Sequence, residues 1–531
     1  ASALIGATGA YEAFQNGDLT TAFLRDSTAI AQAEADGAKM SMDYQDAGGV
    51  LYFNHAADSP TSDATLREAI SLAIDIDVLN DRAHNGDMRV AKSVVVPGSP
   101  YYSDAVLEGA TDAARAAELV AESGFSGTLR LLCGNRGAAV EIGLATEAML
   151  EAIGLDVEIN AQGTSAGIAE MIAGNYDVNC GGWNAGGATA ISSYVRNLQS
   201  TSPSNRMSYE SAEMDSLLSA ALSADKADVP AALAAINNLI VTEWVSVPYG
   251  ALPEGIVIAD NLEGVKQTTS TIFLFDDAYF TSGGQAAPVS ALGTPAEVTP
   301  ACDATVPGSE IVYGPFYAGR GFDPPYSSGA LVGGTELAAV YDTLIRYNPE
   351  TAGFEPQLAR DMTVNEDFTV WTLHLRDGIT YDDGTPLDAD MVVANHERFF
   401  TPTSEDRRII NTSPAFLQFI EETKVIDSLT VEYHLIQPWA TFPFVLSDEP
   451  GFIINVNAVG DDPEAFNALP PAHAGVGAYT VEKNTPGEEI VFKARDNYWG
   501  GPVCVETLRF NMAAASALIG ATGAYEAFQN G

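Results

Sequence analysis

The feature of this sequence that most constrains its fold is an exact repeat at its two ends. Residues 1–17, which read ASALIGATGAYEAFQNG, recur without a single change as residues 515–531. Solenoid repeats recur many times and with drift, whereas this one occurs once, at the extremes of the chain. The pattern indicates a circularly permuted sequence, in which the circle was opened so that the same segment stands at both ends. Because one groove accepts one helix, we expect one copy to pack and continue into Asp18 and the other to be displaced.

A second sign of a permuted order is the segment 282–302, SGGQAAPVSALGTPAEVTPAC, which is rich in Gly, Ala, Pro and Ser. It lacks the apolar periodicity of a helix or strand and has the composition of a linker. A strand-like run, 271–280, precedes it, and another, 310–313, follows it. We therefore interpret residues 281–302 as the join between the original chain ends. An engineered permutation and an artefactual circular gene assembly would both produce it, and a duplicated helix with no evident engineering purpose favours the artefact.

The length and composition are those of a globular protein with more than one core. Domains usually contain one or two hundred residues, and this chain has 531, of which 46% are hydrophobic. No segment approaches the roughly 18 uninterrupted apolar residues of a membrane helix. The 71 acidic and 25 basic residues give a net charge of -46, spread along the chain. Such a surface repels nucleic acid and suits a salty medium, so we expect no nucleic-acid partner.

Hydrophobic periodicity predicts interleaved helices and strands. Alternating residues predict half-buried strands at 369–375 and 430–435. Ala and Leu at helical spacing predict helices at 66–80, 112–122, 138–153, 211–222 and 229–242. Further strands are expected at 129–132, 156–159 and 176–180. This βαβ rhythm is typical of a doubly wound sheet, so the fold class is α/β.

The residues that usually carry chemistry form no recognisable motif. The four cysteines contain no CxxC pair, so a zinc site is not indicated, and either two disulfides or four buried thiols remain open. The histidines show no HxxxH or HExxH spacing, and we expect no metal or cofactor; they are His55, His84, His374, His396, His434 and His473. A hydrolase is the runner-up class, but GxSxG, SxxK and paired-carboxylate motifs are absent and no catalytic residue is assigned. A scaffold protein without a ligand cleft is the third class.

Several motifs fall into one order when the chain is rotated to 303–531 followed by 18–280. They are ELAAVYDTLIRY (336–347), FEPQLARDM (354–362), FTVWTLHLRDGITYDDGTPLDADMVVANHERF (368–399), GVGAY (475–479), DNYWGG (496–501), GVLYFN (49–54) and LREAISLAIDID (66–77). In this order the chain resembles solute-binding protein family 5, the peptide, dipeptide and nickel binders of ABC importers. The resemblance spans nearly all of the chain outside the linker and the repeat.

The resemblance implies a type II periplasmic-binding-protein fold of the large peptide-binding class, whose two lobes close on a solute by a hinge motion. Lobe one would comprise residues 1–53, 251–280 and 303–531, with an extra subdomain at about 345–470, and lobe two residues 54–250. The hinge crossings would lie near 51–54 and 247–251. It further implies an extracytoplasmic protein, periplasmic or lipid-anchored, that works as a monomer and delivers a peptide-like solute to a membrane permease.

Two residues that follow strands of lobe two are the leading ligand contacts. Arg136, in the loop CGNRG, could hold a carboxylate as an arginine of this loop does in dipeptide-binding relatives; the alternative is a solvated surface arginine. Trp183, in CGGWNAGG, could form the floor of a ligand pocket with its indole ring. Dipeptide binders typically carry an Asp shortly after this Trp for the ligand's amino group, but here Asn184 and small residues follow. Longer or blocked peptides, opine-like solutes and oligosaccharides therefore stay open as ligands.

The remaining candidates are residue types that are more often packing or turn residues than ligand contacts. They are Tyr194, Asn205 and Arg206 in lobe two, and Tyr326 and Ser328 in the DPPYSSG loop of lobe one.

Within the implied fold, each lobe has two cysteines in or beside strands that should be neighbours in its sheet. The oxidising compartment of such importers then favours the disulfides Cys302–Cys504 and Cys133–Cys180. Four buried free thiols are the alternative.

Replacing Arg136 with Ala tests whether the ligand carries a carboxylate. A buried guanidinium needs an anion to offset its desolvation, and a charged hydrogen bond is worth about 1.5–3 kcal/mol. We expect Arg136→Ala to weaken binding about 10- to 100-fold in a calorimetric titration. An unchanged affinity would favour a neutral ligand such as an oligosaccharide.

Overall fold

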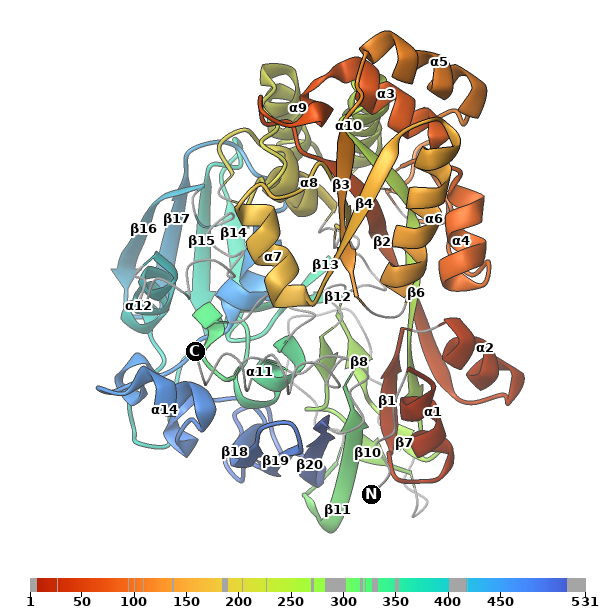
Figure 1. The fold of residues 1–531 in the computed structure, drawn as a ribbon. Coiled ribbons are helices and arrows are strands. Elements are labelled where there is room, and N and C mark those ends of the chain that lie inside the picture. Colours follow the sequence, from red (N-terminus) through yellow and green to blue (C-terminus); the bar gives the residue numbers. More distant parts are fainter. Residues whose placement is uncertain are drawn as a thin grey trace. The chain divides into compact units, whose positions relative to one another are not determined.

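The computed structural model divides into two compact units (Figure 1). Unit 1 contains residues 1–25, 29–42 and 255–531, and unit 2 contains residues 26–28 and 43–254. The structure describes residues 7–25, 27–93, 95–99, 101–107, 109–135, 138–183, 190–202, 204–225, 227–268, 272–281, 302–315, 319, 321–326, 333–348, 353–400, 417 and 419–512.

The sheet of unit 1 is built around a strand that pairs with both ends of the chain. Strand β11 (Val306–Gly314) pairs in parallel with β20 (Val505–Asn511) on one side and with β1 (Thr21–Leu24) on the other. Beyond β20 lie β19 (Glu489–Ala494) and β18 (Tyr479–Thr485), and beyond β1 lies the last part of β6 (Ser246–Ile258). Segments nearly 500 residues apart in sequence therefore share one sheet.

The two faces of this sheet are covered by different cores, as the period of two in β-strands requires. Phe23, Ile311 and Tyr313 point to an aromatic core that includes Phe273, Phe275, Phe492 and Phe510. Their neighbours Ala22 and Leu24 point to the other face, where helices α1 (Ala7–Gln15) and α2 (Ser27–Ala35) pack. The first copy of the repeat thus forms a packed helix that leads into Asp18, and the second copy, residues 515–531, lies outside the described residues.

The rest of unit 1 is assembled from small sheets and short helices. A four-stranded antiparallel sheet has the order β14–β15–β17–β16, and Figure 1 shows its strands side by side. The strands predicted at 369–375 and 430–435 are β15 and β17. The predicted run 271–280 is instead two short strands, β9 and β10, because the chain turns at 276–278 to reach separate partners, β8 and β7. The elements are β7 (Leu262–Glu263), β8 (Lys266–Gln267), β9 (Phe273–Leu274), β10 (Tyr279–Phe280), α11 (Gly334–Val340), β12 (Ile345–Asn348), β13 (Gly353–Pro356), β14 (Ala359–Val364), β15 (Val370–Leu375), α12 (Ala389–Phe400), β16 (Ile420–Asp427), β17 (Thr430–Leu435) and α14 (Pro463–Ala468).

Unit 2 has the doubly wound arrangement that its sequence predicts. Strand β3 (Thr128–Gly134) pairs in parallel with β4 (Asp156–Gln162) and β5 (Val178–Gly181), and β5 pairs antiparallel with β2 (Met40–Phe53). The helices are α3 (Ala64–Ala73), α4 (Ile76–His84), α5 (Ala113–Ser123), α6 (Ala138–Ala152), α7 (Thr164–Ile172), α8 (Ala190–Leu198), α9 (Ala212–Leu222) and α10 (Val229–Thr242). The single helix predicted at 66–80 is two helices, because the Asp75 carboxylate accepts the backbone N–H groups of Asp77 and Val78 and caps a new helix.

The boundaries between the units differ from the expected hinge crossings at 51–54 and 247–251. Residues 50–53 of β2 already pair with β5 and belong to the sheet of unit 2. In β6 it is Gly255 that begins the pairing with β1 of unit 1. The boundaries therefore fall inside two long strands, at 42/43 in β2 and 254/255 in β6.

Each unit contains one disulfide, and the pairs are those expected from the sequence. Cys133 and Cys180 lie one position beyond the paired residues Leu132 and Asn179 of β3 and β5, and their Cα atoms are 4.7 Å apart. Cys504 immediately precedes Val505 of β20 and Cys302 lies four residues before its partner Val306 of β11, with a Cα separation of 5.7 Å between the cysteines. The second bridge closes a sequence separation of 202 residues and ties β11 to β20.

Removal of the long-range bridge should destabilise the protein more than removal of the short one. In the chain-entropy description the cost rises with the logarithm of the loop length, so Cys302→Ser/Cys504→Ser should cost about 2–4 kcal/mol and Cys133→Ser/Cys180→Ser about 1 kcal/mol less. Urea unfolding of both variants measures the difference. Non-reducing peptide mapping of the parent chain provides the control, and four free thiols in that map would contradict the pairing.

Candidate functional site

The predicted ligand residues of unit 2 lie on one face of its sheet. Leu51, Leu131 and Val178 point to the core that α3, α4 and α6 cover. The alternate residues point to the opposite face, where the indole of Trp183 stacks on the Tyr52 ring at 5.9 Å. Tyr194, from α8, meets Trp183 edge-on at 6.1 Å. The three rings form an aromatic cluster at the carboxyl end of β5, which is where open α/β sheets place ligand sites.

Trp183 and Tyr194 are fully buried, so neither forms the exposed floor that the sequence suggested for Trp183. The Tyr52 hydroxyl donates to the Gly182 carbonyl oxygen at 2.5 Å and fixes the backbone just before Trp183. The indole Nε1 is buried without a hydrogen-bond partner among the described residues. In this arrangement the rings of Trp183 and Tyr194 are buried beside the carboxyl end of β5 and are not presented to solvent.

Two arginines lie near this cluster. The Arg206 carbonyl oxygen accepts a 2.6 Å hydrogen bond from the Tyr176 hydroxyl. Burial, with a further contribution from the nearby Arg196 guanidinium, lowers the pKa of Arg206 below its usual range. Asn205 has a local role, since its amide donates to the carbonyl oxygens of Gln199 and Tyr209 and holds the turn. In a chain with so few basic residues, Arg196 and Arg206 bring positive charge to this side of unit 2.

The other predicted residues are distributed differently. Arg136, Asn184 and Ser328 lie outside the described residues. Tyr326 ends a short 3₁₀ helix, Pro324–Tyr326, in unit 1. The preceding Asp323 anchors this turn through a 2.7 Å ion pair with Arg398 of α12. Within unit 2 the structure therefore brings together Trp183, Tyr194 and Arg206.

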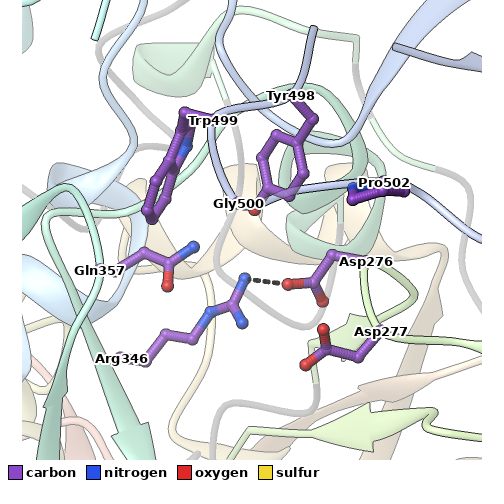
Figure 2. A pocket seen from close by; sticks show the side chains of 8 residues that line it. All are labelled: Asp276, Asp277, Arg346, Gln357, Tyr498, Trp499, Gly500 and Pro502. Atoms are coloured by element: carbon purple, nitrogen blue, oxygen red, sulfur yellow. Dashed lines mark ion pairs between the residues drawn. The ribbon is translucent and has the colours of Figure 1, made fainter. Parts of the chain in front are cut away.

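A polar pocket of unit 1 was not predicted from the sequence. Its volume is about 40 Å³, enough for one or two water molecules. Figure 2 shows the Arg346 guanidinium beside Asp276, with the rings of Tyr498 and Trp499 across the pocket. Arg346 and Asp276 form a 2.8 Å ion pair, and Asp277 pairs with Lys266. Three of the motifs that resemble the family, 336–347, 354–362 and 496–501, contribute residues to this pocket, and they were the signal in the sequence that could have located it.

A buried carboxylate beneath the pocket joins these segments. Asp342 accepts hydrogen bonds from Trp499 Nε1 at 2.7 Å and from Gln357 Nε2 at 2.8 Å, and Arg346 lies 3.5 Å away. Burial, opposed by Arg346 and assisted by Asp276, raises the pKa of Asp342 to about 6. Because its oxygens are occupied by donors from the protein, we assign this network to holding the β12–β13 hairpin against residues 498–499 rather than to ligand binding.

Neither a metal site nor a membrane span is found in the described parts of the chain. No three His, Cys, Asp or Glu side chains gather there in a way that could hold a metal ion. No described helix has both the length and the apolar character that crossing a bilayer requires.

Replacing Trp499 with Phe tests the role of the buried carboxylate. The indole donor stabilises ionised Asp342, so its loss raises the folded-state pKa of Asp342 further above about 6. Destabilisation should reach about 1–3 kcal/mol at pH 8, where the carboxylate is charged, and be smaller at pH 5, where it is largely protonated. Urea unfolding at the two pH values measures this. Trp371→Phe, which removes an indole donor to the Trp439 carbonyl, is the matched control and should show no such pH dependence.

The sequence comparisons agree with the rotated order of the chain. A sequence model of the bacterial extracellular solute-binding proteins, family 5 Middle, matches residues 4–205 and 353–528, more than half of the chain and on both sides of the linker. The dipeptide-binding protein of Escherichia coli (strain K12) is 25% identical over 226 residues, which cover 39% of this chain and 42% of that protein. The peptide transport periplasmic protein SapA of Salmonella typhimurium is 28% identical over 197 residues, 34% of this chain and 35% of that protein. The matches therefore span less than half the length of these relatives.

Among solved structures, the substrate-binding domain of an oligopeptide ABC transporter from Bacillus anthracis aligns with a TM-score of 0.45. The aligned residues are 21% identical and cover 51% of this chain and 56% of that chain. The family match, the α/β units and the order of the motifs agree, and the chain belongs to the bacterial extracellular solute-binding proteins of family 5.

Proposed function

We propose that this protein is the extracytoplasmic binding component of an ABC importer, which captures a peptide or peptide-like solute as a monomer and delivers it to a membrane permease. The observation that carries the proposal is the family match over parts of both units. Proteins of this family are solute-binding proteins rather than enzymes. Relatives named for dipeptide binding and peptide transport favour a peptide over the alternative opine-like and oligosaccharide ligands.

The residues that we propose for ligand recognition are Arg136, Trp183, Asn184, Tyr194 and Arg206 of unit 2, and Tyr326 and Ser328 of unit 1. Their roles differ with their burial. Trp183 and Tyr194 are fully buried, so we assign them to supporting the backbone at the carboxyl end of β5. Arg206 is partly exposed and adds positive charge, as Arg136 would.

The charges around this site indicate which end of a peptide is recognised. Arginines are present, whereas the five residues after Trp183 are Asn184, Ala185, Gly186, Gly187 and Ala188, without an acid. A peptide carboxylate therefore has a charged partner in this proposal, and a free amino group has none of the kind that dipeptide binders typically provide. We propose a ligand that is held by its carboxylate and tolerates a blocked or distant amino end.

Blocking either end of a peptide separates these contributions. For a dipeptide or tripeptide that binds, we expect amidation of the carboxyl end to weaken binding about 10- to 100-fold, because a charged hydrogen bond is lost. Acetylation of the amino end should change the affinity less than about threefold, a difference below 1 kcal/mol. Isothermal titration of the free, amidated and acetylated peptides measures both effects.

A thermal-shift screen of peptides, oligosaccharides and opine-like compounds provides the control for ligand class. A ligand at 100 times its Kd stabilises the folded state by about 2.7 kcal/mol, which is a readily measured shift of the melting temperature. Stabilisation by sugars with none by peptides would contradict the peptide proposal. A peptide that loses its affinity on acetylation rather than amidation would contradict the proposed orientation.

A further inference from the structure

Helix α1 occupies a well-defined site on unit 1. Ala10, Tyr11 and Ala13 are buried against Ala22 and Leu24 of β1, among the other residues of this core. At the exposed edge the Tyr11 hydroxyl and the Gln15 amide both donate to the Asp36 carboxylate, at 3.0 and 2.7 Å. These contacts define what a helix needs in order to bind here: small residues facing the sheet, one tyrosine, and a glutamine one turn later.

Residues 515–531 meet each of these requirements because they repeat residues 1–17 exactly. Tyr525 corresponds to Tyr11, Ala527 to Ala13 and Gln529 to Gln15. The chain thus carries a second, chemically identical occupant for the α1 site.

The topology of unit 1 also places this second occupant within reach. β20 and β1 are both parallel to β11, so they run in the same direction, two strand spacings or roughly 10 Å apart. Parallel strands of this kind are usually joined by a crossover helix that packs on one face of the sheet. Residues 512–520 separate the end of β20 from residues 521–529, the counterpart of α1, and can extend over about 30 Å. The α1 site lies two strand spacings across the sheet from β20 and one layer above the sheet, a distance of roughly 14 Å. The linker is therefore long enough to reach it.

We infer that residues 515–531 are an alternative ligand of the α1 site, able to replace residues 1–17 within the same chain. When the second copy is bound, it leads from β20 to the site beside β1. This is the path that a crossover helix would take in the unpermuted chain. The first copy keeps an advantage in the full-length protein because five residues tether it to β1, compared with nine from β20 to the second helix. Loop-closure entropy then favours the first copy by about two- to threefold.

Cross-linking at the edge of the site tests this exchange. Gln15 contacts Asp36, so Gln15→Cys/Asp36→Cys reports the first copy and Asp36→Cys/Gln529→Cys reports the second, each joined by a short bismaleimide. All four native cysteines are in disulfides and do not interfere. In the full chain we expect an intramolecular link in both variants, about two to three times more for residue 15. In a chain that begins at Asp18, the 36–529 link should rise to the level of the 36–15 link.

Matched substitutions in the shortened chain show whether the link reports helix docking. Ala527→Asp places a charge at the position equivalent to Ala13, which is 1% exposed, and should abolish the 36–529 link and lower the melting temperature. Glu526→Ala changes the position equivalent to exposed Glu12 and should alter neither. Failure of the shortened chain to form the link, or a link formed only between two molecules, would overturn the inference.

Discussion

Unit 1 depends on the parallel pairing of strand β11 with strands from opposite ends of the chain. Its partner β20 lies just before the second copy of the repeat, and its partner β1 just after the first. Neither partner can be lost without exposing an edge of β11 and the aromatic core beneath it, which contains Phe23, Tyr313 and Phe510. The disulfide between Cys302 and Cys504 fixes the same pairing covalently at one end. In the present order of the chain, β11 has both of these parallel partners.

Successive residues of a β-strand point to opposite faces of a sheet. In unit 1 this alternation separates two cores, and in unit 2 it separates the core from the candidate site. Residues on one face of β2, β3 and β5 pack under helices, and those on the other face meet the aromatic cluster around Trp183. The buried rings pack at the carboxyl end of β5, where the Tyr52 hydroxyl donates to the Gly182 carbonyl oxygen and holds the backbone before Trp183.

Local patterns were sufficient to predict most of the elements. Helices α5, α6 and α10 and strands β15 and β17 lie within a residue or two of their predicted bounds, because their periodicity is determined by burial on one side. The break between α3 and α4 was missed although Asp75 carries a capping signal, since the apolar pattern continues across it. The unit boundaries fall inside the long strands β2 and β6, where neither a turn nor a linker composition marks them in the sequence. For the candidate site, the sequence singled out Trp183 and Arg206 but could not show that Trp183 is fully buried, and the Asp342–Trp499 contact joins residues 157 apart.

The most direct test of the account is to rebuild the chain in its rotated order. A chain of residues 302–531 followed by 18–281 contains one copy of the repeat and joins Gly531 to Asp18, as Gly17 is joined in the present chain. Hydrogen exchange measured by mass spectrometry should show equal protection of the β1, β11 and β20 amides in both chains, because the strand pairs are the same. Loss of protection in β1 or β20 of the rotated chain would contradict the claim that the two ends of this sequence complete one sheet.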